Sequence, residues 1–168
     1  MSKENSETIP QPPHLDGVIK ALKQNMKMGP ELLPTFFLTS PAETIIVCTP
    51  FESNTDKDMI AMMIRKMARE KNVTSLAFVS ESWMVDTDYA QEFMDNRDKY
   101  PNVSDFPHKH DIVMIMYEGP DGNAFGRATV FQDRSIGEIE WIKSTGMDGR
   151  FANLLPRQTT DDGAGSTH

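Results

Sequence analysis

The chain has 168 residues, which suits one domain of ordinary size, and its formal net charge at pH 7 is −8. Apolar residues make up 38% of it, and no apolar run approaches the roughly 18 residues that span a membrane. This composition predicts a soluble globular protein, and it argues against general binding of nucleic acid, which requires a basic face. The polar N-terminus lacks an apolar signal segment and Cys48 is the single cysteine, so we expect a cytoplasmic location.

Both ends of the sequence are polar. Residues 1–13 contain three prolines and, after the first methionine, Ile9 as the only sizeable apolar side chain. Residues 156–168 contain no bulky apolar residue. Neither segment can bury enough apolar surface to offset the entropy cost of ordering it, so we expect two flexible tails around a single domain at 14–155.

The first ordered element is expected to be a helix over residues 14–28. Its apolar residues recur every three or four positions, and Gly29 with Pro30 ends it. The β-rich runs 34–39 and 43–49 follow. Because only three residues separate these two runs, they are expected to pair as an antiparallel hairpin.

A second, longer helix is predicted over residues 54–72. Asn54 or Thr55 can cap its N-terminus, and basic residues gather toward its C-terminal end, where the helix dipole favours them. The run 73–80 that follows is apolar on both faces, which is typical of a central strand. The buried stripe of the helix is expected to contain Ile60, Met63, Ile64, Met67 and Ala68, widened by Met59 and Met62.

The second half of the sequence predicts a meander of three strands. After a weakly patterned connection at 86–107, with a short helix near 89–94, strand-like runs occupy 110–117, 125–132 and 136–143. The element order is therefore α-β-β-α-β-loop-β-β-β. It predicts an α+β domain in which a mostly antiparallel sheet of about six strands carries two main helices on one face.

The negative charge is concentrated in residues 81–111. That stretch holds eight acidic and three basic residues, so its net charge of −5 is more than half of the −8 of the whole chain. One interpretation is a solvated connection whose charge maintains solubility. The alternative is an acidic face that binds a basic protein or a cation.

His108 and His110 are candidate metal ligands. On an extended segment, residues two apart point to the same side, so both imidazoles can converge on one ion, with Asp105 or Glu81 as a carboxylate ligand. Two histidines and a carboxylate suit zinc or non-haem iron. The alternative is a pair of exposed histidines ahead of a strand, because no second His- or Cys-rich cluster completes the pattern.

A second candidate site lies at Ser80–Trp83, where the first central strand is predicted to end. Trp83 can form the wall of a pocket beside Glu81, or it can pack beneath the connection that follows. If this strand pairs antiparallel with the strand that begins at His110, Glu81 should lie close to His110. The pairing would then favour the protonated form of that histidine.

Cys48 and the methionines carry weaker signals. A cysteine inside an apolar strand is usually buried and inert. The 12 methionines can either fill a core or form an adaptable interface. The sequence has no motif for a phosphate loop, a dinucleotide site, a nucleophile elbow, an HExxH zinc site or an EF-hand.

These observations favour a non-catalytic binding or interaction protein, of the small accessory kind encoded by bacteria and phages. It is expected to bind a protein partner or a second copy of itself, with no cofactor, nucleic acid or membrane. The alternative is a metal-dependent hydrolase or oxygenase that uses His108, His110 and a carboxylate. The residues expected to bind the ligand or partner are Glu81, Trp83, His108, His110 and Asp111.

Overall fold

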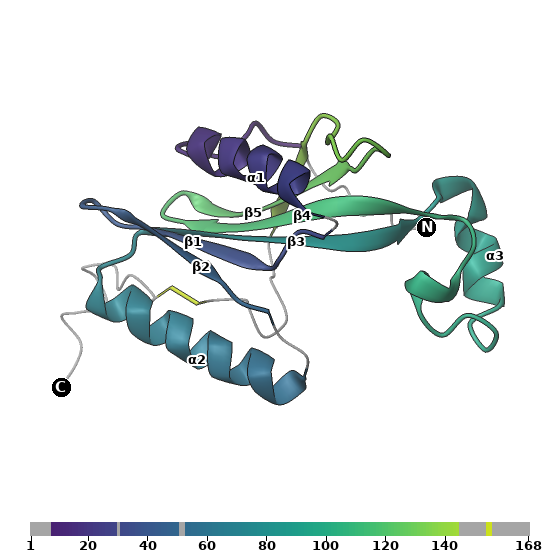
Figure 1. Ribbon diagram of the computed structural model, residues 1–168, viewed down its shortest axis with the longest axis horizontal. Helices are drawn as coiled ribbons and strands as arrows, with labels where there is room; N and C mark the ends of the chain where they lie inside the picture. The colour runs from purple at the N-terminus through teal and green to yellow at the C-terminus, as the bar shows by residue number, and fades with distance from the viewer. Residues whose placement is uncertain (1–7, 30, 51–52, 145–153, 156–168) are drawn as a thin grey trace.

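The computed structural model describes residues 8–29, 31–50, 53–144 and 154–155. In this part of the chain, six strands form one antiparallel sheet in the spatial order β2-β1-β3-β4-β5-β6 (Figure 1). The predicted α+β class and element order are confirmed. The strands are β1 (Thr35–Thr39), β2 (Thr44–Cys48), β3 (Ser75–Val85), β4 (Lys109–Gly119), β5 (Gly122–Thr129) and β6 (Glu140–Ser144).

Two long helices cover opposite faces of the sheet. In Figure 1, α1 (Asp16–Met28) lies above the strands and α2 (Asn54–Glu70) lies below them. The expectation that both helices share one face is wrong. The central strands are apolar on both faces, and covering both faces with helices excludes water from each. No helix in the described ranges is long and apolar enough to cross a membrane.

The core above the sheet lies beneath α1. Val18, Leu22 and Met26 are buried at spacings of four residues, which confirms the predicted amphipathic stripe. They belong to one apolar cluster with side chains of β1, β3, β4, β5 and β6. The helix begins later than predicted because His14 has a φ of 66°, a left-handed conformation that a helix does not contain.

The core below the sheet lies above α2. Ser53, rather than Asn54 or Thr55, caps this helix: its hydroxyl accepts a hydrogen bond of 3.1 Å from the backbone N–H of Asp56. The small side chains on the sheet side of the helix let it approach the strands closely. The buried residues of α2 are Ala61, Ile64 and Ala68.

Leu154 completes this lower core. Its side chain is fully buried in the α2 cluster, and the carboxylate of Glu118 on β4 accepts the backbone N–H groups of Leu154 at 3.0 Å and Leu155 at 3.1 Å. Burial raises the pKa of Glu118 above its ordinary value, while these two hydrogen bonds and the charge of Arg65 act in the opposite direction. Glu118 therefore joins this returning segment to the sheet.

β3 and β4 continue past the rest of the sheet as a two-stranded arm. β3 was expected to end at Ser80, but it runs to Val85 and pairs with β4 as far as Lys109. The pairing of β1 with β3 reaches only Val79, and the β5 ladder ends at Ile112. Figure 1 shows this arm projecting from the body, with α3 at its tip.

The tip of the arm is a small folded unit. It contains two 3-10 turns, Thr87–Tyr89 and Val103–Asp105, and α3 (Ala90–Asp95), which confirms the predicted short helix. Phe93 and Phe106 are buried there, with their ring centroids 5.2 Å apart in an edge-to-face arrangement. The acidic connection thus folds around its own aromatic core.

Thr8 and Ile9 lie outside the span that the sequence assigned to the domain, yet they pair with β6. Thr8 forms a bridge with Ile142, and the backbone N–H of Ile9 donates to the carbonyl of Trp141 at 3.0 Å. The Ile9 side chain also packs against the core beneath α1. The chain therefore joins the sheet before its first helix begins.

Candidate functional site

β2 is an edge strand, and its hydrogen bonds to β1 follow a regular alternation. The backbone N–H of Thr49 donates to Pro34 at 2.8 Å, and that of Ser40 donates to Glu43 at 2.8 Å. In an antiparallel pair, residues whose backbone N–H and C=O bond to the partner strand alternate with residues whose backbone groups point away from it. The odd-numbered residues from 43 to 49 therefore direct their backbone groups toward β1.

The even-numbered residues Thr44, Ile46 and Cys48 direct their backbone groups outward. Each has one N–H and one C=O, so three donors and three acceptors line the open side of β2. Within the described ranges no strand pairs with them. β2 contains no charged residue and no proline, the two residue types that commonly protect an exposed edge from pairing.

The surface above this edge is apolar. Ile46 is 57% exposed, and Cys48 is exposed with its Sγ 3.7 Å from the hydroxyl of Thr35. Met28 and Leu33 are also exposed, and they line one shallow hollow together with Cys48. The expectation that Cys48 is buried is wrong, because no β2 side chain belongs to the core beneath α1.

The surface below the edge is apolar too. Ile45 and Val47 point to the α2 face, where they are half-buried against the α2 core. Ile60 and Met67 of α2 pack against the same cluster. The edge strand therefore has apolar side chains on both of its faces, next to backbone groups that are ready to pair.

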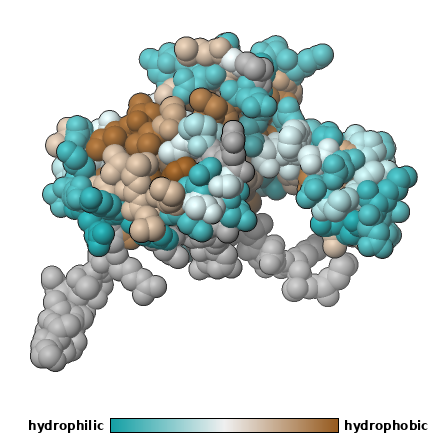
Figure 2. All heavy atoms as spheres, turned by 60° about the horizontal axis from the view of Figure 1, so that its bottom comes forward, coloured by the Kyte–Doolittle hydropathy of each residue, from teal (hydrophilic) through white to brown (hydrophobic). Residues whose placement is uncertain are grey.

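One flank of α2 extends this lower apolar surface. Arg65 lowers the pKa of Glu118 and Arg69 lines a hollow with Glu118, so that flank of the helix faces β4. At about 100° per residue, Met63 and Met67 lie on the opposite flank, which faces β1 and β2. Figure 2 looks from the α2 side and shows brown and tan apolar surface on the body, with teal polar surface over the arm tip.

The predicted buried stripe of α2 was partly wrong. Met59, Met62 and Met63 are 64%, 69% and 42% exposed. Residues 59–64 are all apolar, so the sequence there does not indicate which side faces the sheet. The exposed methionines fit the interface alternative better than the core alternative.

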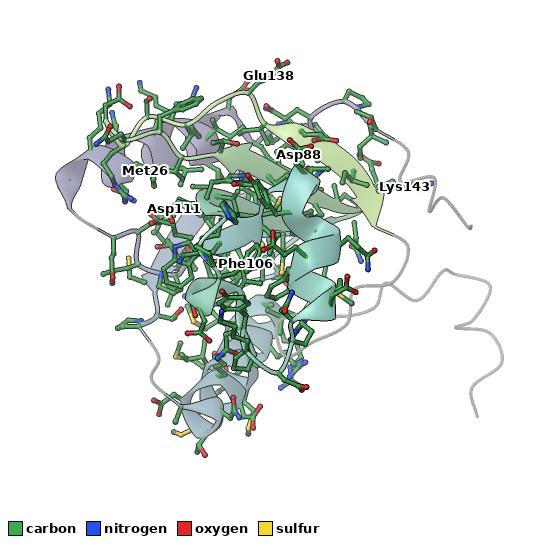
Figure 3. All side chains as sticks on the ribbon, turned by 90° about the vertical axis from the view of Figure 1, so that its right-hand side faces the viewer. Met26, Asp88, Phe106, Asp111, Glu138 and Lys143 are labelled. Atoms are coloured by element: carbon green, nitrogen blue, oxygen red, sulfur yellow. The ribbon has the colours of Figure 1, made fainter. Side chains whose placement is uncertain are left out.

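The predicted site residues lie on the arm, and an arginine that the sequence did not single out contacts one of them. Arg134 lies 2.9 and 3.1 Å from the two carboxylate oxygens of Glu81, and its Nε donates to the carbonyl of Met26 at 3.2 Å. The hydrogen bond to Glu81 is the largest cause of the raised pKa of Arg134, and Asp111 contributes. Figure 3 shows Met26 and Asp111 on the same side of the sheet.

No sequence pattern indicates this role of Arg134. It occupies a turn with a φ of 68°, after Asp133, whose carboxylate accepts hydrogen bonds from Ser135 and so has a lowered pKa. The sequence predicts the turn. It does not predict that the arginine reaches back to a strand and a helix far away along the chain.

The expected neighbourhood of Glu81 and His110 is wrong, although the antiparallel pairing of their strands is confirmed. Glu81 lies opposite Val113, and His110 lies opposite Met84. Three positions of register separate them, and side chains alternate between faces, so they point to opposite faces of the arm. His110 instead places its Nδ1 2.7 Å from the carboxylate of Asp86.

His108 has an aromatic environment. Its ring stacks on Tyr89 with the centroids 3.7 Å apart and an angle of 7°, and it meets Phe106 edge-on at 5.7 Å. The Asp105 carboxylate accepts a hydrogen bond from the backbone N–H of Asn102, the residue that caps the same 3-10 turn. Across the ranges that the structure describes, no three His, Cys, Asp or Glu side chains are grouped so that they can hold a metal ion.

Trp83 and Asp111 face each other across the two strands of the arm. Both lie on the α1 face, and Trp83 is 49% exposed because α1 does not extend over the arm. The backbone carbonyl of Asp111 accepts the N–H of Val130 at 2.9 Å. Trp83 therefore presents about half of its surface to solvent beside the partly buried Asp111.

Searches of protein-family models, curated proteins and solved structures find no match to this chain. Two surfaces are candidates on geometry. One is the arm, where Glu81, His108 and His110 each contact a different residue outside the predicted site, and the other is the open edge at β2. The edge presents ordered backbone donors and acceptors between two apolar rows, a combination that has a defined chemical partner.

Proposed function

We propose that this is a protein-interaction module that binds an extended segment of a protein partner along β2. In this mode of recognition, the bound segment adds a strand to the sheet. Its backbone hydrogen bonds supply affinity, and contacts with alternate side chains supply specificity.

The observation that carries the proposal is the outward alignment of the backbone groups of Thr44, Ile46 and Cys48. A strand laid beside β2 satisfies these groups and covers Ile46 on one face. On the other face it extends the contact of Ile45 and Val47. Burial of apolar side chains provides the favourable free energy, and the hydrogen bonds fix the register.

The polar side chains of the arm differ from the backbone groups of β2 in having partners within the chain. Glu81 is paired with Arg134, His110 is paired with Asp86, and His108 stacks on Tyr89, so these three side chains already contact other residues of the chain. The outward backbone groups of β2 are held in an equally regular strand, and they have no strand partner in the described part of the chain.

Selection of peptides from a displayed library of extended 12-residue segments tests the proposal. The full chain is immobilised at low density so that its copies are separated. We expect binders rich in β-branched and aromatic residues, with NMR shift changes centred on the amides of Thr44, Ile46 and Cys48.

The variant Ile46→Pro removes one outward N–H without removing a hydrogen bond to β1, and it should abolish binding. Ile46→Val keeps the N–H and is the matched control, which should bind within a few-fold of the wild type. Binders that are insensitive to Ile46→Pro, or that shift residues elsewhere, would overturn the proposal.

A further inference from the structure

The sequence and register of β2 make it complementary to itself. We propose that the segment that pairs with β2 is β2 of a second copy of this chain, antiparallel about a two-fold axis through Ile46. This inference rests on the proposed function, namely that the open edge is the binding surface, and it names the partner.

The hydrogen-bonding register leads to this axis. With the axis through Ile46, the outward groups of Ile46 pair with those of the other Ile46, and Thr44 pairs with Cys48 in both directions. Three donors and three acceptors on each copy then make six hydrogen bonds. An axis through Ile45 or Val47 leaves Cys48 or Thr44 without a partner at the end of the strand.

The side chains match in the same register. Above the sheet the two Ile46 side chains, each 57% exposed in one copy, cover one another. Below the sheet Ile45 of each copy lies opposite Val47 of the other, in the closer type of pair in which side chains make more contact. All of these contacts join β-branched apolar side chains, which pair favourably across strands.

The charge of α2 is also complementary to itself. Its first half, residues 54–61, has two acidic residues and one basic residue, and its second half, residues 62–70, has three basic residues and one acidic residue. A two-fold axis perpendicular to the sheet at β2 sets the two α2 helices antiparallel on the same face. The acidic half of each helix then faces the basic half of the other, and the flank with Met63 faces the partner.

The other edge of the sheet limits the assembly to two copies. β6 is covered at its centre by Thr8 and Ile9, so only one edge of each copy is open in the described part of the chain. A two-fold contact that uses the same edge of both copies closes on itself and cannot extend into a filament. The expected product is a dimer with one continuous sheet.

Sedimentation of the full chain tests this inference. We expect the wild type to have twice the mass of one chain and to dissociate on dilution. Ile46→Lys and Ile46→Glu should each weaken the dimer at least about 100-fold, because the axis places two like charges directly opposite one another. An equimolar mixture of the two variants should regain the dimer, as Lys then meets Glu. Met94→Lys also replaces an exposed apolar side chain with lysine, but it does so on the arm tip, and this variant should remain dimeric.

The outcomes separate this inference from the proposed function. A monomeric wild type that still binds selected peptides in an Ile46→Pro-sensitive manner overturns self-pairing and leaves the proposed function standing. A dimer that survives Ile46→Lys, or a mixture that fails to associate, also overturns self-pairing about Ile46. If Thr44, Ile46 and Cys48 amides are protected from exchange in a monomer, the edge is already occupied within one chain, and both proposals are overturned.

Discussion

At the β6 edge, the backbone N–H of Ile9 donates to Trp141, and the indole of Trp141 is 4% exposed beneath α1. At the β2 edge, no described strand pairs with the outward backbone groups of Ile46, and its side chain is 57% exposed. Both strands are five residues long and lie at the ends of the same sheet. An N-terminal segment therefore covers one edge of the sheet, while the more apolar edge is open as far as the described residues go.

The difference shows that edge protection is selective in this fold. At β6, the pairing segment is followed at once by Pro10, and then by Pro12 and Pro13, which cannot donate to a further strand. β2 has neither a covering segment in the described residues nor a charge or proline of its own. An apolar edge strand without such protection is prone to aggregation unless a partner pairs with it.

The largest loss of stability should come from removing the Trp141 side chain, which is buried at the covered edge. Trp141→Ala should lower the free energy of unfolding by about 3–5 kcal/mol, because the ring packs beneath α1 and over Gly126 on the neighbouring strand. Trp83→Ala is the matched control on the half-exposed arm and should cost about 1 kcal/mol or less. Urea unfolding measures the free energy of unfolding of both variants. Equal losses of stability would contradict the view that Trp141 is buried and Trp83 is half-exposed.

The β2 edge can be tested with proline at adjacent positions. The alternation directs the N–H of Val47 to β1 and the N–H of Ile46 outward, so Val47→Pro should cost about 3 kcal/mol and Ile46→Pro about 1 kcal/mol or less. Urea unfolding at a concentration where the wild type is monomeric compares them. Val47→Ala measures how much of the cost of Val47→Pro comes from losing the valine side chain. Equal destabilisation by the two prolines would show that the register of β2 differs.

Sequence patterns predicted much of this fold because the central strands are strongly apolar. The runs 73–80 and 110–117 indicated buried central strands, and β3 and β4 occupy the two central positions of the sheet. The placement of the helices could not be predicted, because an amphipathic helix does not indicate which face of a sheet it covers. In α2, residues 59–64 are all apolar, so their pattern does not indicate which side of the helix faces the sheet. The side that faces it contains Ala61, Ile64 and Ala68.

The candidate site could be predicted only in part. The hairpin 34–39 and 43–49 was expected, but edge position depends on the pairing of β1 with β3, which is a contact distant in sequence. On the arm, the strand was expected to end at Ser80, so Glu81 was expected at its end, beside the first residue of the next strand, His110. The strand continues to Val85, and in the observed register Glu81 lies opposite Val113, three positions from His110. An odd shift in register places a side chain on the other face of the sheet.

A small effect on stability, and the most direct test of the comparison between the two edges, should come from opening the covered edge. Ile9→Pro removes the N–H that donates to Trp141 and should cost about 1 kcal/mol, measured by urea unfolding. Ile9→Ala keeps that N–H and controls for loss of the isoleucine side chain.

With both edges open, sheets can join at either end, so sedimentation of Ile9→Pro should show species larger than a dimer that increase with concentration. Adding Ile46→Lys to Ile9→Pro should limit the assembly to pairs joined through β6, because only that edge can then accept a strand. If Ile9→Pro alone does not assemble beyond the state of the wild type, residues 8 and 9 do not limit the growth of the sheet.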